Sequence, residues 1–200
     1  MTTTTLPVFS GDRGLSRYLN EIKKFPILSA QEEFLLAKNY LERGEAEAAH
    51  KLVTSHLRLV AKIAMQYRGY GLPVADLISE GNLGLMRAVK KFEPDRGFRL
   101  STYAMWWIKA SVTEYILRSW SLVKMGTMSA QKKLFFSLRK AKRKLNIIDF
   151  QTIDPDKAAN LAETFNIPVA EITHMDRRIT SRDLSLNAPI SNSEGDSMEF

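Results

Sequence analysis

Residues 98–120 concentrate two types of side chain that suit contact with nucleic acid. The stretch FRLSTYAMWWIKASVTEYILRSW contains the three tryptophans of the chain, two tyrosines and a phenylalanine, with Arg99, Lys109 and Arg118 among them. Aromatic rings stack on unpaired bases for about 1–3 kcal/mol per base, and neighbouring cations bind phosphates. The pattern indicates either a surface that grips single-stranded nucleic acid or an aromatic core stripe, which is the commoner arrangement.

Helical spacing predicts which rings share a face. Tyr103, Trp106, Trp107 and Ala110 stand at positions i, i+3, i+4 and i+7. Adjacent tryptophans point about 100° apart on a helix, so both cannot face one core equally. We expect one indole to line the core and the other, with Tyr103, to face a partner.

The distribution of charge also indicates a polyanionic partner. The net charge is +7, and residues 115–148 contain nine Lys or Arg and no acidic residue. Residues 183–200 contain four acidic residues and no basic one. A nucleic-acid face followed by an acidic tail explains this asymmetry, and a solvated basic helix explains it equally well.

Several classes of function lack their motifs. The sequence contains no phosphate-cradling glycine loop, nucleophile elbow or metal-binding helix motif, so we expect neither an enzyme nor a cofactor. The three histidines, His50, His56 and His174, are scattered, which favours packing or surface roles over a metal site. The absence of cysteine, of a signal peptide and of any apolar run near ~18 residues favours a cytoplasmic protein without membrane insertion.

The elements that must position the aromatic stretch are predicted to be helices throughout, giving an all-α fold. Residues 28–45 open with a capping box, Ser29 to Glu32, and end near Gly44. Further helices are expected over 45–71, ended by Gly69 and Gly71, and over 74–92, after Pro73. A turn at 92–97 leads into the aromatic helix, for which Ser101 is the predicted N-cap.

The second half of the chain predicts a smaller helical module. A basic helix over 129–145 precedes two short helices that are separated at 166–168, a pattern compatible with a helix-turn-helix. We therefore expect four segments: a disordered tail (1–11), a helical bundle (12–120), a three-helix domain (121–182) and an unstructured acidic linker (183–200).

Two blocks resemble a known family. Residues 76–116, DLISEGNLGLMRAVKKFEPDRGFRLSTYAMWWIKASVTEYI, closely resemble the signature block of bacterial sigma factors. Residues 131–140, QKKLFFSLRK, look like the signature of the heat-shock (RpoH-type) subclass. The resemblance covers about residues 12–182. It implies sigma regions 1.2 and 2 followed by a region 3-like domain. It also implies a specificity subunit that binds RNA polymerase core, recognises the promoter −10 element and opens the strands.

The resemblance implies a polymerase-binding surface on the helix that carries DLISEGNLGLM. In the family this helix docks on a coiled coil of the largest catalytic subunit of the polymerase. Leu77, Ile78, Leu85 and Val89 would supply its apolar side. The implied contacts are Asp76, Ser79, Glu80, Asn82 and Met86.

The next helix in the family reads the −10 element and holds the non-template strand with its rings. The implied DNA-binding residues are Arg96, Phe98, Arg99, Ser101, Thr102, Tyr103, Trp106, Trp107, Lys109, Thr113, Arg118, Lys124 and Lys132. Two departures predict a different base preference, since Leu100 replaces a usual aromatic and Ala110 replaces the glutamine that reads the upstream base pair. Met128 and Gln131 replace the His and Glu that read an extended −10 element.

The subclass signature also implies regulation by chaperones and a protease, while Leu134, Phe135 and Phe136 are better explained as core. Family members continue into a C-terminal domain that reads the −35 element, so this chain is expected to bind polymerase and −10 DNA without that reading. Two alternatives remain at this stage. One is a free-standing helical DNA-binding regulator that uses residues 157–180, and the other is a nucleic-acid enzyme.

Overall fold

The computed structural model describes residues 14–123, 129–144, 153–165, 167–180, 183, 190–191 and 197–198. The chain divides into two compact units, Met1–Trp120 and Ser121–Phe200, which are described separately. Helices dominate both units, and the predicted all-α fold class is confirmed.

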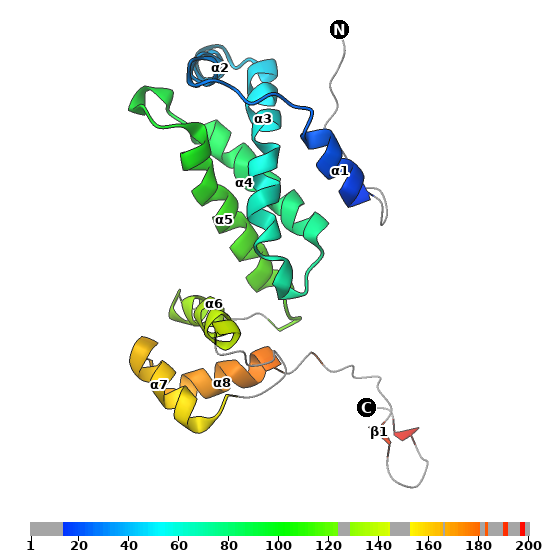
Figure 1. Cartoon of the computed structure of the whole chain (residues 1–200), viewed down its shortest axis with the longest axis vertical. Helices are drawn as coiled ribbons and strands as arrows, with labels where there is room; N and C mark the ends of the chain where they lie inside the picture. The colour runs from blue at the N-terminus through cyan, green and yellow to red at the C-terminus, as the bar shows by residue number, and fades with distance from the viewer. Residues whose placement is uncertain are drawn as a thin grey trace. The chain divides into compact units, whose positions relative to one another are not determined.

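The first unit is a bundle in which three long helices carry most of the contacts (Figure 1). Its helices are α1 (Gly14–Ile22), α2 (Ala30–Arg43), α3 (Ala46–Met65), α4 (Val74–Lys91) and α5 (Leu100–Ser119). Two 3₁₀ turns, η1 (Arg68–Tyr70) and η2 (Pro94–Arg96), connect α3 to α4 and α4 to α5. α5 packs chiefly along α4, and α3 packs against both.

The ends of α2 follow the predicted capping signals. The Ser29 backbone N–H donates to Glu32 Oε2 at 2.8 Å, and the Glu32 N–H donates to Ser29 Oγ at 3.3 Å. Gly44 ends the helix with φ 65°, a left-handed conformation that a residue without Cβ adopts at little cost. The sequence therefore predicted both ends of α2 correctly.

The core of the first unit is a contiguous apolar layer between α3, α4 and α5. Its fully buried side chains include Leu52, Leu57, Val60, Leu77, Ile78, Leu85, Ile108, Val112 and Ile116. Leu77, Ile78, Leu85 and Val89 are buried as predicted, so the polar side of α4 is turned away from this core.

The second unit contains α6 (Ser129–Lys144), α7 (Pro155–Phe165) and α8 (Val169–Thr180). Leu134 and Phe135 are each 1% exposed, which agrees with their predicted core role, and they are buried with Ile172 and Met175 of α8. Phe136 is half-buried and its ring meets that of Phe135 edge to face at 5.1 Å.

The basic helix α6 does not present all its cations to solvent, which corrects the simple picture of a charged face. Lys142 is 0% exposed and Arg139 is 9% exposed. Lys142 Nζ forms an ion pair with Asp176 Oδ1 and donates to Thr180 Oγ1 at 3.0 Å, so it joins α6 to α8. Asp176 Oδ2 also accepts from the Ile153 N–H at 2.8 Å.

In the acidic segment the structure describes Asp183 and two short strands. Strands β1 (Ile190–Ser191) and β2 (Ser197–Met198) pair antiparallel, with Ile190 opposite Met198. Asp183 accepts from the Leu122 N–H at 2.8 Å and from the Ser121 hydroxyl at 2.9 Å, and these bonds lower the pKa of its carboxyl. Within 183–200 the structure describes only residues 183, 190–191 and 197–198, so the unstructured acidic linker stays a prediction.

Candidate nucleic-acid interface

The start of α5 differs from the predicted capping. The helix begins at Leu100, and Ser101 lies inside its first turn, so the prediction of Ser101 as N-cap was wrong. Arg99 occupies the N-cap position and its side chain makes no capping bond. The Leu100 N–H instead donates to Glu33 Oε1 of α2 at 2.7 Å. A carboxylate distant in sequence performs the capping that the sequence assigned to a local hydroxyl.

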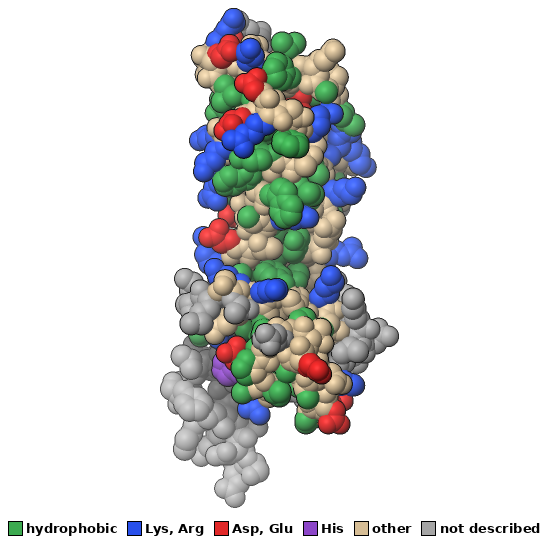
Figure 2. All heavy atoms as spheres, turned by 90° about the vertical axis from the view of Figure 1, so that its left-hand side faces the viewer, with side chains coloured by type: hydrophobic (Ala, Val, Ile, Leu, Met, Phe, Trp, Pro, Cys, Tyr) green, Lys and Arg blue, Asp and Glu red, His purple; other side chains and the backbone are tan. Residues whose placement is uncertain are grey.

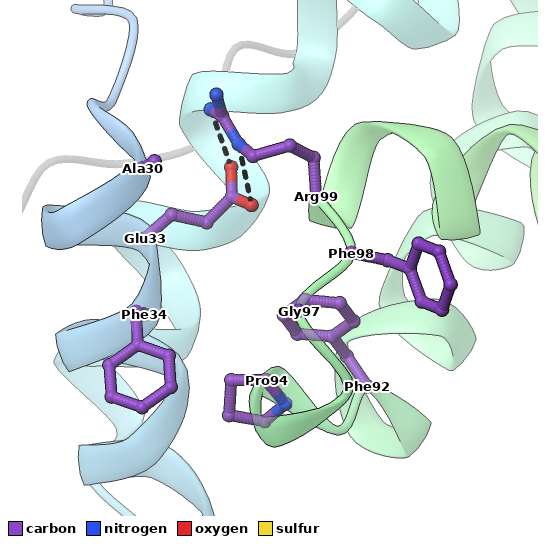
Figure 3. Close-up of a pocket in the computed structure, with 8 residues that line it drawn as sticks. All are labelled: Ala30, Glu33, Phe34, Phe92, Pro94, Gly97, Phe98 and Arg99. Carbon is purple, nitrogen blue, oxygen red and sulfur yellow. Dashed lines mark hydrogen bonds and ion pairs between the residues drawn. The ribbon is translucent and has the colours of Figure 1, made fainter.

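Glu33 is the hub of this region (Figure 3). Its side chain is 3% exposed, and it accepts from Arg99 Nε at 3.1 Å and from Arg99 Nη2 at 3.0 Å. His56 Nε2 of α3 lies 3.6 Å from Glu33 Oε2. Arg99 Nη2 also donates to the Leu28 carbonyl at 3.2 Å. The carboxylate thus links α2, α3 and the first residues of α5.

The protonation of Glu33 reflects these contacts. Burial raises the pKa of its carboxyl, but bonds from His56, Arg99 and the Leu100 N–H, with the charge of Arg99, outweigh burial and lower the pKa to about 2. The same bond and charge raise the pKa of Arg99. The pair is therefore ionised at neutral pH.

His56 is a packing histidine, as predicted. It is 9% exposed, and its Nδ1 lies 2.8 Å from the Leu52 carbonyl oxygen and 3.1 Å from Ser55 Oγ. No group of three or more His, Asp or Glu side chains that could hold a metal ion occurs in the described part of the chain.

A shallow pocket lies beside the Glu33–Arg99 pair and is bordered by rings. It is lined by Ala30, Glu33, Phe34, Phe92, Pro94, Gly97, Phe98 and Arg99. Gly97 has φ 75°, so the chain turns sharply after η2, and Phe98 then projects outward with 69% of its surface exposed. In Figure 3 the ring of Phe98 points away from α2, whereas Arg99 points toward it.

The paired tryptophans have different surroundings, as helical geometry predicted, but Tyr103 packs against the less exposed indole and not beside the exposed one, which corrects that part of the prediction. Trp106 is 68% exposed, and Lys109 Nζ lies 5.7 Å from its ring centroid. Trp107 is half-buried and meets the Tyr103 ring edge to face at 6.2 Å. The Phe92 ring also packs near Tyr103, and the centroids of these two rings are 6.0 Å apart. Trp106 is thus the indole available to a partner, while Trp107 is held in a row of rings.

Lys91 belongs to this surface, although the sequence did not single it out. Its Nζ lies 4.9 Å from the centroid of the Trp107 ring, across the junction of α4 and α5. Its position at the end of another helix gave no spacing signal. On the face drawn in Figure 2, hydrophobic side chains lie along the middle of the first unit, with Lys and Arg side chains at both edges.

Two glycines of α4 lie at close helix contacts, Gly84 against the aromatic helix α5 and Gly81 against Val60 of α3. A Cβ at Gly84 would lie 2.7 Å from the Trp107 carbonyl oxygen and 2.9 Å from Ser111 Oγ. A Cβ at Gly81 would lie 2.7 Å from Val60 Cγ1. The backbone of Trp107 therefore rests directly on Gly84, and this contact helps to place the indoles.

The other predicted DNA-binding residues have varied positions. Arg96 is exposed and donates to Glu93 Oε2 at 2.7 Å, and Thr113 Oγ1 donates to the Lys109 carbonyl at 2.8 Å within its own helix. The Arg118 guanidinium carbon lies 5.9 Å from the Tyr115 ring centroid. Ser101 is half-buried and Thr102 is exposed. Lys132 is exposed in the second unit, and Lys124 lies outside the described residues, as does Met128.

The predicted polymerase contacts on α4 also differ from one another. Asp76, Ser79 and Met86 are exposed and Glu80 is half-exposed. Asp76 Oδ2 accepts from the Tyr115 hydroxyl at 3.3 Å. Leu83, which the sequence did not single out, is 43% exposed on the same helix.

Asn82 is turned toward α1 instead. Its Nδ2 donates to the Tyr18 hydroxyl at 3.4 Å, and its Oδ1 is buried without a hydrogen-bond partner among the described residues. The helical pattern alone could not show this, because α1 is distant in sequence.

Comparison with known proteins decides the family. The family description Sigma-70 region 2 matches residues 52–121, and Sigma-70 factor, region 1.2 matches residues 15–46. RNA polymerase sigma factor RpoH of Rhizobium radiobacter is 59% identical over the whole chain and 67% of its own length. The chain belongs to the sigma-70 family. In the terms of that family, α2 lies in region 1.2, and most of α3, α4 and α5 lie in region 2.

Other sigma-70 relatives agree. RpoH of Caulobacter vibrioides is 60% identical over 95% of this chain and 64% of its own length. The RNA polymerase sigma-C factor of Myxococcus xanthus is 46% identical over 91% of this chain and 61% of its own length. The chain thus spans a little under two thirds of the length of several curated relatives. None of the helices in the described ranges is both long and apolar enough to cross a membrane.

Proposed function

We propose that this chain acts as a transcription initiation factor of the heat-shock (RpoH) type. It binds RNA polymerase core and directs it to promoters by recognising the −10 element and opening the strands. As a sigma subunit it supplies specificity and no catalysis, and it works in the cytoplasm. Chaperones and a regulatory protease are further proposed partners, through the 131–140 segment.

The observation that carries the proposal is the exposed indole of Trp106 with the Lys109 ammonium beside it, in a region 2 helix. A base that leaves the duplex loses its stacked neighbours, at a cost of a few kcal/mol. Exposed rings replace those neighbours, and adjacent cations bind the backbone. Phe98 and Trp106 supply exposed rings, Tyr103 and Trp107 supply supported ones, and Lys91 joins the predicted cations.

The exposed part of α4 supports the polymerase-binding half of the proposal. Asp76, Ser79 and Met86 are exposed and Glu80 is partly exposed, and these four residues are offered as contacts with the coiled coil of the largest catalytic subunit. Leu83 adds an exposed apolar side chain to the same helix. Asn82 is a weaker candidate, since its amide donates to Tyr18.

The departures from the housekeeping pattern support a distinct promoter preference. Leu100, which replaces a usual aromatic, is fully buried, so no ring is available to the strand at this position. Ala110 is exposed and has no group that donates or accepts a hydrogen bond. Gln131 is half-buried in the second unit, and reading of an extended −10 element stays a prediction.

The decisive experiment uses the purified chain, sigma-free polymerase core and a fork-junction DNA with a single-stranded −10 element. We expect retention of DNA that requires core and is lost with a scrambled single strand. The double variant Trp106→Ala with Trp107→Ala should bind core normally and lose opening of duplex promoter DNA. Binding to duplex without core would favour the helical regulator instead, and unchanged opening by the double variant would remove the tryptophans from the proposed site.

A further inference from the structure

We infer that Glu33, a region 1.2 residue, is a positioning residue for strand opening because it fixes the first residues of the aromatic helix and orients Arg99. This inference rests on the proposed function. It adds a residue from a different part of the sequence to the opening machinery of α5.

The first step concerns the guanidinium of Arg99. Both of its bonds to Glu33 use Nε and Nη2, and Nη2 also donates to the Leu28 carbonyl. Nη1 has no hydrogen-bond partner among the described residues, and the side chain is 47% exposed. The bidentate pair therefore locks the plane of the guanidinium and leaves its Nη1 edge for a strand phosphate. An arginine held in this way loses less side-chain entropy on binding.

The second step concerns the backbone. Glu33 Oε1 accepts from the Leu100 N–H at 2.7 Å, so the same carboxylate fixes the residue at which α5 begins. Phe98 stands two residues earlier, after the turn at Gly97, and it is 69% exposed. Positions 99 and 100 are both bound to Glu33, and in Figure 3 the ring of Phe98 points away from α2.

The third step is that Glu33 cannot itself bind a strand phosphate. It is 3% exposed and negatively charged, so it acts on the strand through Arg99 and Phe98. The low pKa of its carboxyl supports a permanent charge at this point. Its other neighbour, His56 of α3, is 9% exposed and lies 3.6 Å from Glu33 Oε2.

The test is the salt dependence of binding by the complex of core and full chain to the fork-junction DNA. Glu33→Gln should reduce the slope of log affinity against log salt by about 0.7, the value of one phosphate contact on a single strand. We expect roughly tenfold weaker retention at moderate salt, since a charge-assisted hydrogen bond is worth about 1.5 kcal/mol. Core affinity should stay unchanged, because the exposed face of α4 is untouched.

The matched control is Glu42→Gln, which removes the same charge from an exposed position of the same helix and should keep the wild-type slope. Arg99→Gln gives a second route, because it removes the half-exposed guanidinium itself, although it leaves the Glu33 carboxylate buried without its cation. It should lower the slope by the same amount, and the double variant should be no worse than either single one.

The outcomes separate this inference from the proposed function. If the wild-type complex does not retain the fork, the proposed function fails. If the wild type retains it while Glu33→Gln and Arg99→Gln both keep the full slope, only the positioning role is overturned.

Discussion

Glu33 in the first unit and Asp176 in the second are both buried carboxylates with a cationic partner, and they differ in the exposure of that partner. The Arg99 side chain is 47% exposed, whereas Lys142 is 0% exposed. Glu33 also fixes a helix start and Asp176 accepts from a loop N–H. When one partner of an ion pair is exposed to solvent, as Arg99 is, the buried charge can influence the protein surface. When both partners are buried, as Lys142 and Asp176 are, the pair acts on the packing of its own unit.

The comparison also separates cations that the sequence had placed in one class. Arg99 in the aromatic stretch 98–120 and Lys142 in the basic run 115–148 are both cations of segments that indicated a nucleic-acid partner. Only Arg99 has a donor directed to solvent, while Lys142 joins α6 to α8 from within. Charge runs in a sequence therefore overstate the surface available to DNA.

The largest effect should come from breaking the buried ion pair between Lys142 and Asp176. Lys142→Met leaves Asp176 buried without its cation, and this should lower the free energy of unfolding of the second unit by about 3–5 kcal/mol. Urea unfolding followed by circular dichroism measures it. Lys140→Met, an exposed cation on the same helix, should change little. Wild-type stability of Lys142→Met would mean that the pair contributes nothing to the fold.

The contribution of the Glu33–Arg99 pair to the free energy of unfolding should depend on pH. The folded pKa of Glu33 is about 2, below its ordinary 4.5, so its contribution is complete above about pH 5 and is lost as the pH falls toward 2. Glu33→Gln should therefore cost about 3 kcal/mol at neutral pH and progressively less in acid. Unfolding of both proteins at several pH values tests this, with Glu42→Gln as the baseline. A cost that does not vary with pH would contradict it.

A third variant tests whether the aromatic helix depends on close packing as well as on Glu33. Alanine at an ordinary helical glycine is favourable by about 1 kcal/mol, but at Gly84 its Cβ meets the backbone oxygen of Trp107 at 2.7 Å. We expect a net loss of about 1–3 kcal/mol and a changed tryptophan fluorescence. At Gly81 the obstacle is Val60 Cγ1, so Val60→Ala should partly rescue Gly81→Ala. A stabilised Gly84→Ala would show that α4 and α5 are free to separate.

The smallest effect should distinguish exposed from buried cations of α6. Lys132→Ala should reduce the salt slope of promoter binding by roughly 0.9 if it contacts a duplex phosphate. The side chain of Lys132 is exposed, so the substitution should not change the fold. An unchanged slope would remove Lys132 from the proposed DNA surface.

The sequence by itself predicted the helices and the family. Capping residues, glycines and apolar periodicity are local signals, so the ends of α2, the start of α4 after Pro73 and the turn before α5 were predicted correctly. The burial of Leu77, Ile78 and Leu85 followed from helical spacing. The block at 76–116 identified the sigma family before any contact was known.

Only the tertiary structure decided which charges act together. Glu33 and Leu100 are 67 positions apart, Lys142 and Thr180 are 38 apart, and Asn82 and Tyr18 are 64 apart. Helical periodicity predicts which residues are neighbours on one helix, but it does not predict contacts with a side chain of another helix. Ser101 was therefore predicted as the cap where Glu33 performs that role, and Lys91 was missed beside Trp107. Burial and pairing of charges depend on how helices meet, and that is a property of the packed bundle.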